Sequence, residues 1–146
     1  MNAKIIESRL RVFLLLLASA LCLGTIAELW LTEHIKTPTQ FLPFFLCGVG
    51  LAVVLTMLIR PRRETIFALR IVMGIIALFS LFGVYEHVEG NWKFALEIQS
   101  AAPSLEIFWS AIKGANPLLA PGILALTAMI AVAATYYHPA LGNRND

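Results

Sequence analysis

Four long runs of apolar residues alternate with shorter polar segments along the chain. The runs cover roughly residues 10–31, 41–58, 66–85 and 118–137. Each is close to the ~20 residues that a helix needs to cross ~30 Å of hydrocarbon. The runs are continuous rather than alternating, and lipid cannot satisfy an open backbone, so we predict four transmembrane helices rather than strands.

The segment 86–117, between the third and fourth runs, is too long and too apolar for a simple connector. Apolar and polar residues alternate over 92–99, which predicts an extended, half-buried stretch. The spacing then becomes helical, with Ser104 as the expected N-cap and Gly114 as the terminator. Four large apolar side chains share one face of this short helix: Leu105, Phe108, Trp109 and Ile112.

An amphipathic helix that carries a tryptophan is typical of the membrane interface. We therefore expect the helix within 86–117 to lie at the outer surface, where its apolar face covers the bundle or binds a partner. Trp92 belongs to the same expected interface. The fold class that follows is all-α: an integral-membrane, four-helix, up-down bundle forming a single domain over residues 1–146, with one extra interfacial helix.

Composition agrees with this fold class. The chain is 59% hydrophobic and 14% charged, with a mean hydropathy of +0.79. Soluble domains carry about a quarter charged residues. The formal net charge is only +2 and no basic run is long enough to follow a phosphate backbone, so nucleic acid is not an expected partner. The expected surroundings are the lipid bilayer.

The basic residues predict how the chain threads the membrane. Eight of the 11 Lys and Arg residues flank the first run, the turn after the second or the end of the fourth, and the other three lie in the opposite loops. The positive-inside rule then places both termini in the cytoplasm. Arg70 is expected to reach the inner surface with its long side chain. The eight residues are Lys4, Arg9, Arg11, Arg60, Arg62, Arg63, Arg70 and Arg144, and the three are Lys36, Lys93 and Lys113.

The first apolar run would suit a signal peptide in one respect, because basic residues precede it and "ASA" follows its core. The run continues well past Ala20, however, which is too far for a typical signal core. A retained membrane anchor is the favoured interpretation.

Two apolar runs that cross outward both stop at a Glu-His pair, Glu33-His34 and Glu86-His87. In an up-down bundle these pairs lie at one depth on the outer end. The plainest interpretation is that they are interfacial residues where helices leave the hydrocarbon.

Two further interpretations involve a cofactor. In one, His34 and His87 are axial ligands of a b-type haem, with Gly83 leaving room for the ring. In the other, a group of Glu and His side chains binds zinc, copper or iron. That group is Glu28, Glu33, His34, Glu86 and His87.

Glu28 lies about one turn inside the outer end of the first run. An ionisable group there is costly unless it faces protein or water. Glu28 either reaches the interface or is protonated and hydrogen-bonded within the bundle; in the functional alternative it is the proton or cation handle of a small ion-coupled carrier. No G-x-S-x-G, H-E-x-x-H or Walker pattern occurs, and an enzyme is therefore not the expected class.

Four short motifs give the chain an outline that resembles small bacterial four-helix membrane proteins with no assigned activity. The resemblance implies a bacterial inner membrane and four spans, and it carries over no catalytic residue. The leading functional expectation is a non-enzymatic accessory or scaffolding subunit with a membrane-protein partner, or a homo-oligomer. The motifs are "AELWLTEH", "GVYEHVEGN", "GANPLLAPG" and "YYHPAL".

Overall fold

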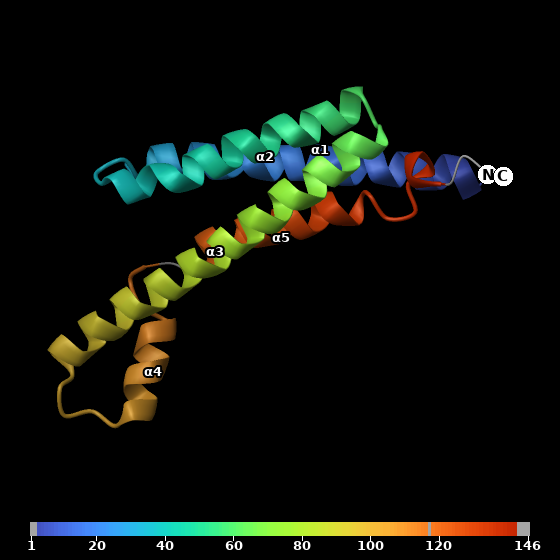
Figure 1. Cartoon of the computed structure of the whole chain (residues 1–146). Helices are drawn as coiled ribbons and strands as arrows, with labels where there is room; N and C mark the ends of the chain where they lie inside the picture. Colours follow the sequence, from blue (N-terminus) through green and yellow to red (C-terminus); the bar gives the residue numbers. More distant parts are fainter. Residues whose placement is uncertain (1–2, 117, 143–146) are drawn as a thin grey trace.

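The computed structural model of the protein describes residues 3–116 and 118–142, and within these ranges every regular element is a helix (Figure 1). The elements in chain order are α1 (Ala3–Leu31), the 3-10 helix η1 (Pro38–Gln40), α2 (Phe41–Ile59), α3 (Arg63–Ile98), α4 (Ser104–Ile112), α5 (Leu119–Ala133) and the 3-10 helix η2 (Pro139–Leu141).

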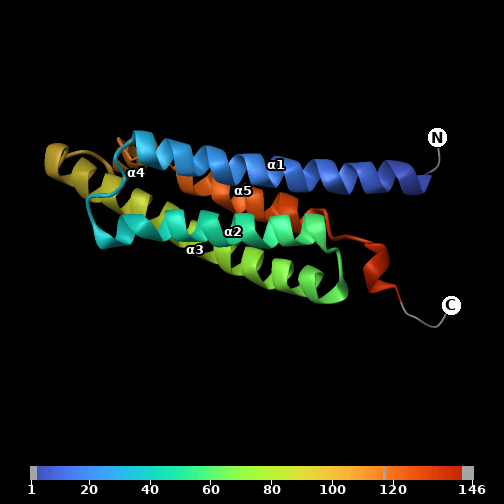
Figure 2. The same cartoon turned by 90° about the horizontal axis from the view of Figure 1, so that it is seen from above.

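The long helices run alternately in opposite directions. α1 packs against both α2 and α5, and α3 packs against α2, α4 and α5 (Figure 2). Leu69, Met73 and Ile76 of α3 are almost fully buried, and they belong to the same core cluster as small residues of α5 such as Ala128 and Ala131. Small residues allow helix backbones to approach closely, which membrane helices use in place of a hydrophobic driving force.

Three segments are long and apolar enough to cross a membrane: Ala3–Leu31, Pro38–Ile59 and Arg63–Ile98. Only 33%, 28% and 28% of the residues in their most apolar windows are buried inside the protein. Most of the apolar side chains therefore face outward, as they do in a protein solvated by lipid. By length and composition these helices indicate a membrane protein.

The fourth predicted span is shorter than expected. α5 has 15 residues and ends at Ala133, so the prediction of a helix that continues to residue 137 is wrong. At 1.5 Å per residue, α5 is about 22 Å long. After Ala133 the chain continues in turns, in which Thr135 N donates to Val132 O at 2.9 Å and Tyr136 N to Ala133 O at 3.1 Å. Tyr137 then adopts a left-handed backbone conformation, with φ 47°, and its carbonyl accepts a hydrogen bond from Arg11 Nη2.

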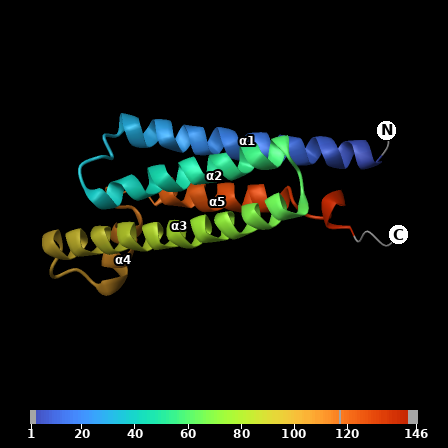
Figure 3. The same ribbon diagram turned by 45° about the horizontal axis from the view of Figure 1, so that its top comes forward.

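α3 departs furthest from the prediction. It is one helix of 36 residues, about 54 Å long, and it passes through Glu86-His87 without a break (Figure 3). The extended stretch predicted over 92–99 is therefore wrong as far as Ile98. Asn91 and Ala95 are buried on the same face at helical spacing, and Lys93 Nζ pairs with Glu89 Oε1 one turn away at 2.6 Å.

The short helix predicted within 86–117 is confirmed as α4. Pro103, rather than Ser104, is the N-cap residue, and no side chain caps the helix. α4 packs on α3 through Ile107 and Ala111, which are 4% and 0% exposed. The predicted apolar face points the other way, and its four side chains, Leu105, Phe108, Trp109 and Ile112, are all exposed.

Candidate functional site

His34 and His87 come from different elements but lie within electrostatic range of each other. His34 lies in the turn after α1, where its backbone N–H donates to Leu29 O at 2.9 Å. His87 belongs to the middle of α3. The pKa of His34 is lowered, first by burial and second by the charge of nearby His87. A lowered pKa keeps the imidazole neutral at pH 7, which is the form that binds metals.

The Glu-His pairs differ in what they do to their helices. α1 ends at Leu31, two residues before Glu33, as predicted. α3 continues for another 11 residues after His87, so the prediction that both pairs end a helix is wrong for Glu86-His87. His87 is therefore part of a continuous helix. His34, by contrast, lies in a turn in which Glu33 has a φ of 51°.

The carboxylates do not gather around the histidines. Glu28 and Glu86 are exposed, and Glu33 pairs with Lys36 at 3.6 Å. Among the residues that the structure describes, no group of three or more His, Cys, Asp or Glu side chains is arranged to hold a metal ion. The five ligands expected from the sequence are thus not assembled into one site in these ranges.

Gly83 has a different role from the one expected of it. A Cβ atom at this position would lie 3.2 Å from Cβ of Pro121 in α5. The missing side chain therefore allows α5 to approach α3 closely, and the space that it leaves is filled by a proline. The expected opening for a haem ring at Gly83 is not present.

Asn91 joins α3 to the end of α4. Its side chain is 3% exposed. Nδ2 donates to Ala111 O at 2.9 Å and to Asn116 O at 3.0 Å, and Oδ1 accepts from Asn116 N at 3.0 Å. Gly114 makes room for this amide, since a Cβ there would lie 2.3 Å from Asn91 Cγ. This role of Asn91 was not predicted from the sequence.

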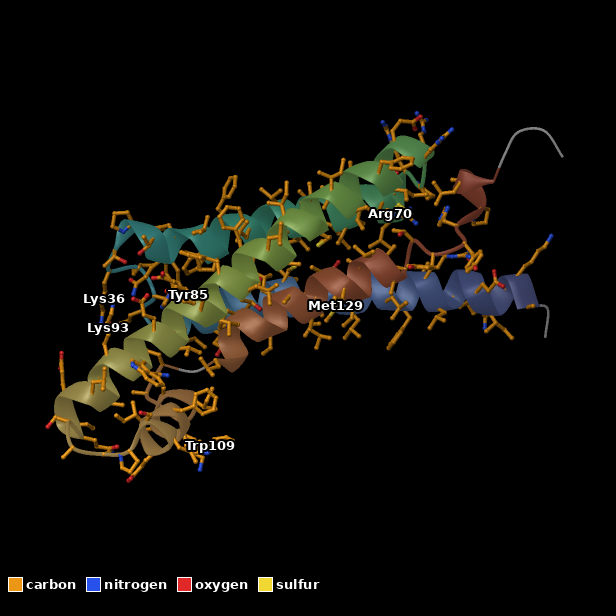
Figure 4. All side chains as sticks on the ribbon, turned by 60° about the horizontal axis from the view of Figure 1, so that its bottom comes forward. Lys36, Arg70, Tyr85, Lys93, Trp109 and Met129 are labelled. Atoms are coloured by element: carbon orange, nitrogen blue, oxygen red, sulfur yellow. The ribbon has the colours of Figure 1, made fainter. Side chains whose placement is uncertain are left out.

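Two arginines bind the segment that follows α5. Arg70 of α3 donates from Nε to Thr135 Oγ1 at 2.9 Å and from Nη2 to Thr135 O at 3.2 Å, and it points toward that segment (Figure 4). Arg70 was expected to reach the inner surface with its side chain, but its guanidinium instead contacts Thr135. Arg11 of α1 donates from Nη2 to Tyr137 O at 2.8 Å. Both cations lie near the C-terminal, partially negative end of α5.

A cavity of about 440 Å³ opens at this same end of the molecule. Lys4, Glu7, Ser8 and Arg11 of α1 line one side, and His138 lines the other. The pKa of His138 is lowered by burial and then by the charge of Arg11. Its Nδ1 accepts from Ala140 N at 3.1 Å, which fixes the orientation of the ring.

Glu28 lines neither this cavity nor the apolar groove of about 240 Å³ between α3 and α5. An ion-coupled carrier would need a water-filled cavity around Glu28, and neither the cavity nor the groove provides one. The carrier interpretation consequently gains no support from them.

Comparison with known protein families, curated proteins and solved structures finds no match to this chain. Function therefore has to be argued from the geometry of the molecule itself.

Proposed function

We propose that the protein is a non-enzymatic accessory or scaffolding subunit of a larger complex in a bacterial inner membrane. In this proposal α1, α2, α3 and α5 cross the bilayer as an up-down four-helix bundle. The start of α1, the turn between α2 and α3, and η2 lie at one end of the molecule (Figure 1). That end carries most of the basic residues, which supports a cytoplasmic location for it.

The outer end of the molecule supports the proposal most directly. The last part of α3 diverges from α1 and α2 and extends past their connection, and α4 folds back along it (Figures 1 and 2). This part of α3 carries the charges of Glu86, Glu89, Lys93 and Glu97, which hydrocarbon would exclude. We therefore place the α3–α4 hairpin outside the hydrocarbon, where a partner can reach it.

The observation that carries the proposal is the exposed apolar face of α4. Leu105 is 68% and Trp109 is 52% exposed, and Trp109 points away from α3 (Figure 4). Phe108 and Trp109 form an edge-to-face pair with ring centroids 5.5 Å apart. Clustered aromatic and leucine side chains of this kind favour burial against another protein, and Trp is common among the residues that dominate binding.

We expect Leu105→Ala and Trp109→Ala to release a stoichiometric membrane-protein partner during mild detergent extraction. Loss of one dominant contact costs about 2 kcal/mol, or about 30-fold in affinity. Co-purification and photo-crosslinking from position 105 measure the effect, and a crosslinked product of twice the monomer mass would identify a second copy of this chain as the partner.

Matched controls are available elsewhere on the surface. Leu78 is 69% and Trp30 is 70% exposed, on α3 and α1 respectively. Leu78→Ala and Trp30→Ala should leave the partner bound. Equal loss in all four variants, or a wild-type protein that emerges as a monomer under several mild conditions, would contradict the proposal.

The charge of His87 contributes to lowering the pKa of His34, and this coupling supports a second candidate, a haem- or metal-binding redox or metal-handling protein. It predicts visible absorbance or stoichiometric metal in protein purified from native membranes, and loss of either signal in His34→Ala and His87→Ala. His138→Ala is the control, because this histidine lies at the opposite end of the molecule. A colourless, metal-free preparation would eliminate this candidate and leave the accessory role intact.

A further inference from the structure

The cavity at the basic end has a charged mouth and an apolar floor. Lys4, Glu7 and Ser8 are exposed at the mouth, within the first two turns of α1. The deeper lining comes from side chains such as Leu15 and Met57, which are 4% and 2% exposed. Such a gradient from polar to apolar follows the membrane normal if the helices cross the bilayer as proposed above.

Arg11 is the best-placed cation in the cavity wall. Its side chain is only 14% exposed, and its contacts with Glu7 Oε2 at 3.3 Å and Tyr137 O at 2.8 Å both use Nη2. The guanidinium has five N–H donors, and within residues 3–116 and 118–142 Nε and Nη1 make no hydrogen bond, so they can donate to an anion. Because these two contacts already fix the side chain, binding an anion would cost little additional side-chain entropy.

Lys4 adds a second positive charge on the same side of α1, since it precedes Arg11 by two helical turns. Ser8 lies between them and adds a hydroxyl donor. Pro61, in the opposite wall, is flanked by Arg60 and Arg62, both exposed. Glu7 is the one acidic residue of the lining among the residues that the structure describes, and it opposes an anion both by its own charge and by its contact with Arg11.

We propose that this cavity binds the phosphate headgroup of an anionic phospholipid. The phosphate contacts Arg11, Lys4 and Ser8, and the glycerol and upper acyl chain cover the apolar floor. Basic pockets between membrane helices on the cytoplasmic side are suited to such headgroups. The volume of about 440 Å³ lies within the range of ordinary small-molecule sites. Inorganic phosphate has the same charge chemistry but would leave the apolar floor uncovered.

The test uses the purified full-length protein in an uncharged detergent and therefore needs no partner subunit. Binding of phosphatidylglycerol, phosphatidylcholine with the same acyl chains, and inorganic phosphate is measured by native mass spectrometry and by thermal stabilisation. We expect phosphatidylglycerol to bind most tightly and phosphate not to displace it. A lysine near the surface contributes about 1 kcal/mol toward anionic lipid, so Lys4→Gln should weaken binding about fivefold.

Three further variants sharpen the result. Lys4→Arg should retain binding, and Glu7→Gln should tighten it, because it removes the opposing carboxylate. Lys36→Gln, at the other end of the molecule, should match the wild type. Equal binding of the two lipids, equal weakening by Lys4→Gln and Lys36→Gln, or displacement by inorganic phosphate would overturn the lipid assignment. The accessory role would survive each of these outcomes, since it depends on α4.

Discussion

Gly114→Ala is expected to detach α4 from α3 and to lower the free energy of unfolding by about 2–4 kcal/mol. The new Cβ would lie 2.3 Å from Asn91 Cγ and 2.6 Å from Asn91 Oδ1. The amide cannot move aside without losing its three hydrogen bonds to Ala111 and Asn116. Amide hydrogen exchange along α4 and unfolding in a denaturing detergent measure the two effects.

A double-mutant cycle separates the clash from other effects of alanine. In an Asn91→Gly background the whole obstructing side chain is gone, including the Cβ atom that would lie 2.7 Å from the new Cβ, so Gly114→Ala should cost much less there than in the wild type. Gly24→Ala and Gly48→Ala are matched controls, because a Cβ at either position meets nothing within 4 Å. We expect them to be neutral or slightly stabilising, since alanine favours helix over glycine. Equal costs in both backgrounds would refute the mechanism.

Arg70→Met should destabilise the protein by about 2–3 kcal/mol, because it leaves a buried hydroxyl and a buried carbonyl without their charged donor. Thr135 is 0% exposed, and its Oγ1 already donates to Val132 O at 2.7 Å. The arginine therefore provides the hydrogen bonds that Thr135 accepts at the end of α5. Methionine keeps most of the volume of the side chain, so the loss reports on polar contacts rather than on packing.

Arg70→Lys tests how much the two-pronged geometry matters. A lysine keeps the charge but lacks the fixed fork of donors, and an intermediate loss of stability is expected. Arg63→Met is the control at the same end of the molecule: Arg63 is exposed and stacks over Phe67 at 5.8 Å. A loss as large for Arg63→Met as for Arg70→Met would show that net charge, and not the contact with Thr135, is responsible.

The helices that the sequence predicted best are those whose limits depend on nearby residues. α2 begins at Phe41 as expected and ends within one residue of the expected position. α4 was found from the helical spacing of its apolar residues and from Gly114. In both cases the signals lie within the helix or just beyond it. The direction in which α4 faces was not predictable, because its buried side depends on α3.

The sequence-based predictions were wrong where contacts with residues far away in the sequence determine the secondary structure. The alternation over 92–99 has the period of a strand, but it does not mark the buried face. α4, later in the chain, packs on α3, in which Asn91 and Ala95 are buried at helical spacing, while Phe94, Leu96 and Ile98 are exposed. Likewise α5 ends early beside contacts from Arg11 and Arg70 in other helices. The cavity at the basic end was not predicted, since α1, α2 and η2 meet there only in the folded chain.

The length of α3 has a mechanical consequence. A proline-free helix of 36 residues is a stiff rod, and at about 54 Å it exceeds the ~30 Å of hydrocarbon by a wide margin. Membrane helices adapt to a thinner or thicker bilayer chiefly by tilting. If α3 crosses the bilayer as proposed, a change in its tilt moves α4, at its outer end, sideways, and bilayer thickness then determines where the exposed Trp109 lies relative to the membrane surface.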